Sequence, residues 1–313
     1  MQFMMGRKKP NKEQFRFGIG EWYGKSFIHL TIDERRFFAM LQHQKKKDRQ
    51  SQPCPPRLAE NPDAVCTKAG GVCSIRVYKL SDNEVTIPLS NLGKLVTTCP
   101  YRFNEGKIIF QWVGKTILDC PDSTIVNEVG FLAKDREIMG VRSGRDDVGR
   151  IDKVLVNPNK ETLSWCALEI QAVYFSGASM KKDFDNIAIN SKDGLPFPAG
   201  IRRPDFRSSG PKRLMPQLQI KVPTLRRWGK KMAVVIDRSF YDSIGDMGKI
   251  KDLSNSDIAW FVVRYKEEEM KQAILEPDFV IYTTLERTVE GLTGGTPVSL
   301  NEFEKRIKIK LKK

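Results

Sequence analysis

Two stretches near the middle of the chain decide the fold: Gly-Arg-Ile-Asp-Lys-Val-Leu-Val at residues 149–156, and Trp-Cys-Ala-Leu-Glu-Ile-Gln-Ala at residues 165–172. Both are rich in β-branched and aromatic residues, and Asn-Pro-Asn-Lys at residues 157–160 is typical of a hairpin turn. Side chains alternate between the two faces of a strand, so Glu169 and Gln171 are expected on one face. The residues between them are expected to point the other way, toward the core.

Further patterns surround this pair of strands. Strands are predicted at residues 125–132, 136–141, 163–175, 217–222, 232–237 and 259–265. A loop is expected at 192–216, and Pro223-Thr224 is expected to start a helix that runs through Trp228. Thr31 or Asp33 is expected to cap a short helix that ends near Leu41. The mixture predicts an α/β (α+β) fold with a central mixed β-sheet flanked by helices.

Changes in composition along the chain divide it into three parts. Residues 1–50 form an extension that is basic at both ends. Residues 51–105 hold four of the six cysteines among turn signals, which indicates a small embedded subdomain. Residues 106–313 are expected to form the core, together with the loops that would contact a partner.

The overall composition narrows the classes of function. The chain has 313 residues and a net charge of +15, which favours a polyanionic partner. It contains only two histidines, so chemistry that depends on several histidines is disfavoured. No apolar run approaches the ~18 residues of a membrane span, and the basic N-terminus lacks the apolar segment of a secretory signal. A cytoplasmic protein without membrane contact is expected.

Acidic side chains interrupt the apolar strands at the centre of the sequence. Asp152 lies in the first strand, and pairing with the second strand would bring it close to Glu169. Glu137, on the preceding predicted strand, would supply a third carboxylate. Converging carboxylates form an oxygen-ligand site suited to Mg²⁺, which stabilises charge on a phosphate under attack. An acidic residue in a strand usually lies on the solvated face of an antiparallel sheet, and this alternative stays open.

The order of these residues resembles that of the PD-(D/E)xK nuclease superfamily, and within it the NotI-like type II restriction endonucleases. An Asp on one strand, here Asp152, is followed on the next by Glu-x-Lys, here Glu169-Ile170-Gln171. Gly-Leu-Pro-Phe-Pro-Ala-Gly at residues 194–200 is similar to the Leu-Pro-x-Pro-Ala-Gly of the NotI-like enzymes. The resemblance implies that Asp152 and Glu169 bind the catalytic Mg²⁺, that Glu137 helps, and that Gln171 replaces the usual Lys.

The exchange of Lys for Gln has a physical consequence. A Lys at this position orients a water molecule and offsets charge on the phosphate. Gln171 forms hydrogen bonds but carries no charge. We therefore expect Gln171 to position the water, and the metal ion to supply more of the electrostatic stabilisation.

The cysteines leave two interpretations open when judged by spacing. No Cys-x-x-Cys pair is present, and free cysteine is a common small buried residue. The layout nevertheless resembles that of the NotI-like enzymes, which implies a structural iron or zinc site with four thiolate ligands. The implied ligands are Cys54, Cys66, Cys73 and Cys99. Cys120 and Cys166 are expected to carry no metal.

Basic residues cluster after the central strands, where they are candidates for DNA binding. Arginine reads guanine edges or holds phosphates, although a solvated loop has a similar composition. The candidates are Arg202, Arg203, Arg207, Lys212, Arg213, Arg226 and Arg227. Residues 45–47 and the tail 305–313 are further basic segments, and the tail alternates like a charged edge strand.

Together these features predict a Mg²⁺-dependent, sequence-specific double-stranded DNA endonuclease of the type II restriction class. The resemblance also implies a homodimer that matches a palindromic site, and a companion DNA methyltransferase in the cell. Two alternatives stay open. One is a non-catalytic nucleic-acid-binding protein whose fold is stabilised by the cysteine-bound metal. The other is a structure-selective repair nuclease of the same fold.

Overall fold

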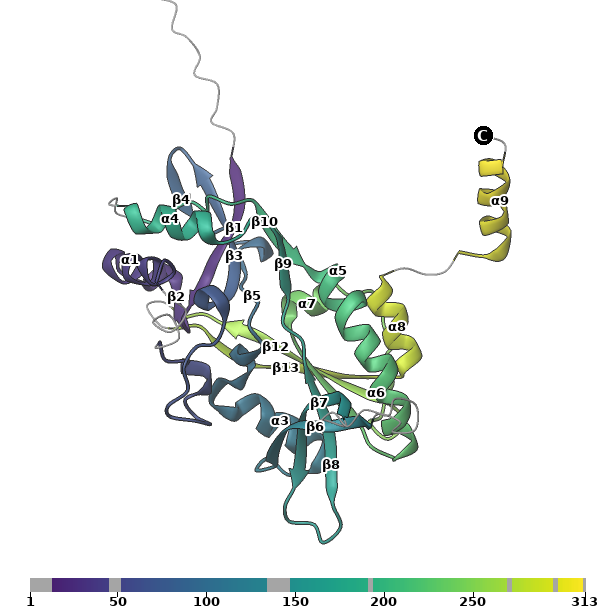
Figure 1. Ribbon diagram of the computed structural model, residues 1–313. Coiled ribbons are helices and arrows are strands. Elements are labelled where there is room, and N and C mark those ends of the chain that lie inside the picture. Colours follow the sequence, from purple (N-terminus) through teal and green to yellow (C-terminus); the bar gives the residue numbers. More distant parts are fainter. Residues whose placement is uncertain are drawn as a thin grey trace, which may run out of the picture.

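A mixed β-sheet forms the centre of the molecule in the computed structural model, which describes residues 13–44, 52–133, 147–190, 194–268, 272–294 and 298–311 (Figure 1). Six of the described strands form this sheet in the order β13-β12-β11-β8-β7-β6. Strand β11 runs parallel to β8 and β12, and the other neighbours are antiparallel. The strands are β6 (Thr124–Ala133), β7 (Asp147–Asn157), β8 (Ser164–Ile170), β11 (Met232–Asp237), β12 (Ile258–Lys266) and β13 (Ile274–Thr283). The predicted central mixed sheet is confirmed.

Helices cover both faces of this sheet. On one face, Phe110 and Val113 of α3 (Ile108–Leu118) share a core with Leu168 of β8. On the other face, Leu218 of α6 (Met215–Arg227) and Leu292 of α8 (Leu285–Thr293) share a core with Ala167. Because neighbouring residues of β8 point to opposite faces, Glu169 lies on the same face as Ala167, under α6.

Helix α6 occupies a segment for which the sequence predicted a strand. The predicted strand at 217–222 is therefore wrong, and so is a helix start at Pro223, which lies inside α6. The apolar residues look alternating over six positions, but the buried residues Leu218, Val222 and Leu225 recur at helical spacing. The helical path also begins earlier, through α5 (Phe206–Ser209) and a π-helical segment (Gly210–Leu214), within the predicted loop.

A second, smaller sheet packs beside the first, in the order β2-β1-β3-β4, with β5 also paired to β3. Its strands are β1 (Gln14–Trp22), β2 (Lys25–Ser26), β3 (Val72–Ser81), β4 (Glu84–Thr86) and β5 (Val96–Thr97). Helix α1 (Ile32–Leu41) lies against α4 (Lys181–Ile189). Its predicted cap is confirmed, because the Thr31 side chain accepts a hydrogen bond from the Glu34 backbone, and Glu34 bonds back to Thr31.

The remaining elements modify other sequence predictions. The predicted strand at 163–175 divides into β8 and β9 (Tyr174–Gly177), and β9 pairs with β10 (Arg202–Asp205). The tail is not an edge strand, because residues 300–311 form helix α9 (Leu300–Leu311), which carries no buried residue. Helix α7 (Arg238–Asp242) follows β11 directly, and the predicted strand at 136–141 lies outside the described residues. Among the described residues, no helix combines the length and apolar character needed to cross a membrane.

Candidate active site

The β7–β8 hairpin brings the two predicted carboxylates together. The strands are antiparallel, with Lys153 opposite Leu168, and the same register continued by one residue places Asp152 opposite Glu169. Directly opposed residues of an antiparallel pair project from the same face. Burial raises the pKa of Glu169, and the negative charge of Asp152 lies close enough to raise it further.

The Glu169 carboxylate lies deep in the protein. Its residue is only 2% exposed, which contradicts the solvated-face alternative, whereas Asp152 is exposed at the rim. Burial, assisted by the nearby Asp152 charge, raises the pKa of Glu169 to about 7. Lys221, reaching down from α6, forms an ion pair with Glu169 Oε1. The site therefore contains a buried carboxylate and an exposed one on the same face.

A pocket of about 360 Å³ lies beside these carboxylates. Its walls come from three parts of the chain, namely the central strands, the helical segment that ends in α6, and the cysteine-rich segment. The residues that line it are Lys68, Thr98, Pro100, Asp152, Ile170, Gln171, Ala172, Tyr174, Arg213 and Gln217. The Arg213 guanidinium lies 3.7 Å from the centre of the Tyr174 ring, and Lys68 Nζ donates to Thr98 O at 2.7 Å. The pocket thus combines the Asp152 carboxylate with two cationic side chains.

Gln171 directly follows the last residue of β8. Its backbone N–H donates to Val235 O at 3.0 Å, which fixes it against the neighbouring strand β11. Its side chain is buried, lines the pocket and donates to Ala172 O at 2.5 Å. Glu137, the predicted third carboxylate, lies outside the described residues.

The four cysteines of the predicted metal site are all free and buried. Cys99 interacts electrostatically with each of Cys54, Cys66 and Cys73. Burial raises the pKa of Cys54 to about 11, and it raises the pKa of the other three thiols as well. Within the described ranges, no three His, Cys, Asp or Glu side chains are arranged to hold a metal ion. The four thiols thus lie close enough to affect one another's pKa, but they are not arranged as a formed metal site.

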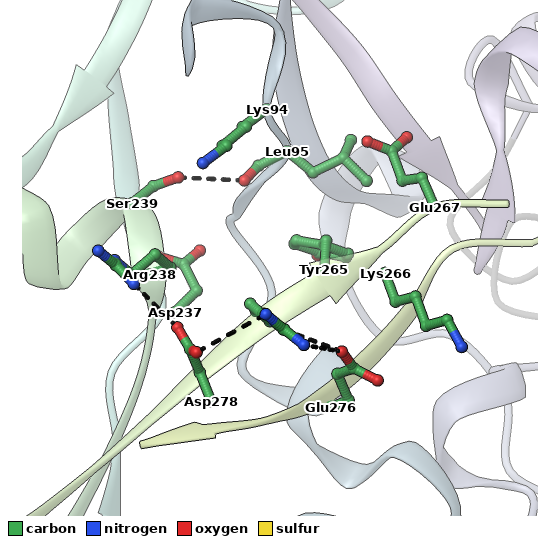
Figure 2. A pocket seen from close by; sticks show the side chains of 11 residues that line it. Lys94, Leu95, Asp237, Arg238, Ser239, Tyr265, Lys266, Glu267, Glu276 and Asp278 are labelled. Atoms are coloured by element: carbon green, nitrogen blue, oxygen red, sulfur yellow. Dashed lines mark hydrogen bonds and ion pairs between the residues drawn. The ribbon is translucent and has the colours of Figure 1, made fainter. Parts of the chain in front are cut away.

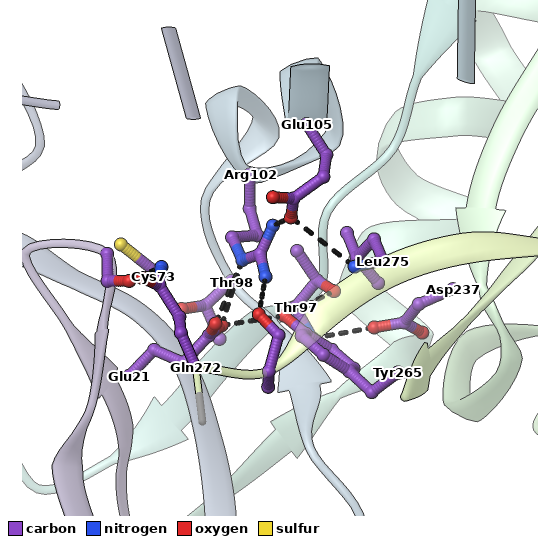
Figure 3. A network of polar contacts seen from close by, with 12 residues as sticks. Glu21, Cys73, Thr97, Thr98, Arg102, Glu105, Asp237, Tyr265, Gln272 and Leu275 are labelled. Carbon is purple, nitrogen blue, oxygen red and sulfur yellow. Dashed lines mark hydrogen bonds and ion pairs between the residues drawn. The ribbon is translucent and has the colours of Figure 1, made fainter. Parts of the chain in front are cut away.

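A buried polar network attaches the cysteine-rich segment to both sheets (Figure 3). Arg102, three residues after Cys99, donates to Glu21 Oε1 at 3.0 Å, and both side chains are fully buried. Thr97 N–H donates to Asp237 Oδ2 at 2.6 Å, and Thr97 O accepts from the backbone of Val173 at 2.8 Å. These contacts fix the chain on either side of Thr98, which lines the pocket.

The predicted DNA-binding residues occupy different environments. Arg202 is 4% exposed, forms an ion pair with Asp183 and donates to the Phe17 backbone at 3.0 Å, so it belongs to the interior. Arg226 pairs with Asp257 and Glu286 on the surface, and Arg227 donates to the Thr224 hydroxyl at 2.9 Å. Arg203, Arg207, Lys212 and Arg213 are exposed, and Arg213 lines the pocket. Residues 45–47 lie outside the described part of the chain.

A second pocket, of about 530 Å³, lies at the ends of β11, β12 and β13 (Figure 2). Its carboxylates already have cationic partners, since Arg238 pairs with Asp278 at 3.1 Å and Arg264 with Glu276 at 2.9 Å. Asp237 accepts hydrogen bonds from the Thr97 and Phe240 backbones. These internal pairings indicate a structural role for its charged residues.

Sequence reasoning missed two cationic residues of the candidate site. Lys221 was assigned to a strand, although counting back four residues from Leu225 would have placed it on the buried face of a helix. Lys68 lies in the turn between Cys66 and Cys73, and nothing in its local sequence indicates that the fold brings it to the carboxylates.

Comparison with known families gives one match that covers most of the chain. The family model described as Restriction endonuclease NotI matches residues 39–275. This range includes the β7–β8 hairpin, α6, the four clustered cysteines and all the pocket residues. The comparison with curated proteins found no match.

Proposed function

Because the chain belongs to the NotI family of restriction endonucleases, and is therefore a type II site-specific deoxyribonuclease, we propose that it cuts double-stranded DNA using Mg²⁺ held by Asp152 and Glu169. The observation that carries the proposal is the meeting of these carboxylates on one face of the sheet, beside a pocket. Carboxylate oxygens suit Mg²⁺, and restriction endonucleases generally use such a divalent ion. Glu137 is proposed as a further acidic group.

The order of elements supports a PD-(D/E)xK core. Helix α3 is followed by the antiparallel strands β6, β7 and β8, then by α6 and by β11, which runs parallel to β8. Asp152 lies on the second strand of this meander and Glu169 on the third, so the paired-strand form of the motif is preserved. We propose that this unit is the catalytic core.

In the proposed reaction, the oxygen of a water molecule bonds to phosphorus as one phosphodiester P–O bond breaks. The water gives up a proton to the surrounding solvent, and the departing sugar oxygen takes up a proton from the solvent. Bound Mg²⁺ stabilises the charge that develops on the phosphate and lowers the pKa of a coordinated water. Gln171 orients the attacking water through its amide, while Arg213 and Lys68 attract the phosphate backbone to the pocket.

DNA is proposed to lie across the exposed basic residues of the segment that reaches the pocket at Arg213. Arg203, Arg207, Lys212 and Arg213 follow one another along β10, α5 and the π-helical segment. Arg226 and Arg227, in the last turn of α6, are proposed as a second basic cluster, whereas Arg202 holds β10 to α4 through Asp183. Two copies related by a two-fold axis would present two such sites to the two strands of a palindrome. A companion methyltransferase would protect the host's own sites.

The cysteine cluster is proposed to hold a structural iron or zinc ion. The four buried thiols suit such an ion in type and number, because tetrahedral thiolate sites bind either metal. The ion would fix the segment that carries Lys68 and Thr98 to the wall of the pocket. Four thiolate ligands leave no open position, so the role is structural.

Digestion of unmethylated phage DNA tests the proposed function. With Mg²⁺ we expect discrete fragments whose sequenced ends share one short motif, and with excess chelator we expect no cleavage. Ends without a common motif would instead support a structure-selective nuclease. Intact DNA that is nevertheless bound would support the non-catalytic alternative.

The raised pKa of Glu169 predicts a pH dependence of metal binding. A divalent ion needs the carboxylate anion, so protons compete with it below the pKa of about 7. Between about pH 5.5 and 7 the apparent Ca²⁺ affinity should rise up to roughly tenfold per pH unit, and it should level off above. Without metal, the unfolded chain loses this proton near 4.5, so folding stability should fall as pH rises from 4.5 to about 7. Calorimetric Ca²⁺ titration checks the first expectation, and a flat affinity would contradict it.

A further inference from the structure

Lys221 is a buried cation in the middle of an otherwise apolar helix face. Its residue is 5% exposed, and it lies among Leu218, Val222 and Leu225 on the side of α6 that faces the sheet. An ammonium group at such a position is costly to desolvate unless it is paired. Its two partners are both oxygen atoms near the candidate site.

These partners tie Lys221 to the metal-binding face of β8. Its Nζ forms an ion pair with Glu169 Oε1, and it also donates to Gln217 Oε1 at 3.0 Å. Gln217 lies one helical turn earlier on α6 and lines the pocket that Asp152 and Gln171 also line. The ammonium therefore lies directly behind the pocket, bonded to the carboxylate through which a metal ion would be held.

The strand itself supplies no positive charge at position 171, which follows Glu169 on the same face. Gln171 on the same face offers hydrogen bonds but no charge. Lys68 and Arg213 line the pocket and are held there by Thr98 O and the Tyr174 ring, whereas the cation in contact with Glu169 is Lys221. Lys221 places a positive charge beside Glu169, but its side chain comes from helix α6 and not from the strand that carries Glu169.

We propose that Lys221 is a positioning residue of this nuclease, whose helix-borne ammonium orients Glu169 and supplies the positive charge that Gln171 lacks. The inference rests on the proposed function, because it assumes that Glu169 holds the catalytic ion. Lys221 occupies Glu169 Oε1 in the metal-free protein, so an incoming divalent ion must share or displace this contact. Lys221 should therefore weaken metal binding while it accelerates cleavage.

The test first removes the positive charge of Lys221 and then supplies a positive charge at position 171. Lys221→Gln should cut DNA about 10²-fold more slowly and bind Ca²⁺ several-fold more tightly than the wild type. The double variant K221Q/Q171K, with the ammonium moved to the strand, should recover at least about tenfold of the lost rate. Lys160→Gln, the same change at an exposed residue of the β7–β8 turn, serves as the matched control. Single-turnover cleavage, calorimetric Ca²⁺ binding and the melting temperature Tm are measured for each variant.

The outcomes separate this inference from the proposed function. If the wild type fails to cut DNA with Mg²⁺, the proposed function fails. If the wild type cuts and K221Q cuts equally fast, only the role of Lys221 is overturned. A slow K221Q variant that Q171K does not rescue, and whose Ca²⁺ affinity is unchanged, would also overturn it, because that pattern indicates structural damage. If K221Q does not fold, Lys221→Met, which keeps the length of the buried chain, carries the same expectations.

Discussion

The Glu169→Gln variant is expected to lose roughly 10³-fold or more of the single-turnover cleavage rate in Mg²⁺. The substitution removes one negative charge and leaves the shape of the side chain and its hydrogen-bond acceptor almost unchanged. Glu169 is the buried carboxylate of the proposed pair. Because its position is enclosed, water from the solvent cannot take its place as a ligand of Mg²⁺. Loss of this charge should abolish most metal binding, and with it the stabilisation of charge on the phosphate.

The effect should be confined to catalysis. Lys221 keeps an oxygen partner in the variant, so we expect the fold to persist, and Tm measures this directly. DNA affinity measured without divalent ions should stay within about threefold, because the exposed arginines that bind phosphates are untouched. Glu161→Gln, at an exposed position in the turn of the same hairpin, provides the control and should cut like the wild type. An E169Q variant that is folded and fully active would remove this carboxylate from the mechanism.

The second large effect is expected at Cys99. Purified wild-type protein should contain one iron or zinc ion per chain by elemental analysis, and Cys99→Ser should contain almost none. Loss of a structural ion should destabilise the protein by at least about 3 kcal/mol and lower Tm by roughly 10 °C. Cys99 is chosen because it interacts with each of the other three clustered thiols.

Cys120 offers a matched control for this substitution. It is also free and buried, but it lies at the end of α3, apart from the cluster. Cys120→Ser should retain the ion, and its Tm should fall far less. A wild-type protein that is free of metal and stably folded would contradict the proposed role of the thiols.

The sequence predicted the central part of this structure well, because the relevant signals are local. The strands at 149–156 and 232–237 have dense β-branched runs, and the turn at 157–160 joins a hairpin whose register follows from its length. The meeting of Asp152 and Glu169 follows from that hairpin alone. The Thr31 cap was equally predictable, because the capping box lies within four residues.

Other features depend on contacts between distant segments, which a local pattern does not contain. Residues 217–222 look like a strand because six residues are too few to distinguish the alternating pattern of a strand from the repeat of a helix. Burial of Glu169 depends on α6 packing over the sheet, so the solvated-face alternative stayed open. The interior position of Arg202 depends on its ion pair with Asp183 of α4. The clustering of basic residues in the sequence does not indicate such a partner.

The most direct test of the shared carboxylate site compares single-turnover cleavage by Asp152→Asn, E169Q and the double variant. If both side chains hold one ion, each single substitution should remove most of the activity, and the double variant should be little slower than the worse single one. Losses that multiply in the double variant, or a single variant that cuts at the wild-type rate, would show that Asp152 and Glu169 do not act together.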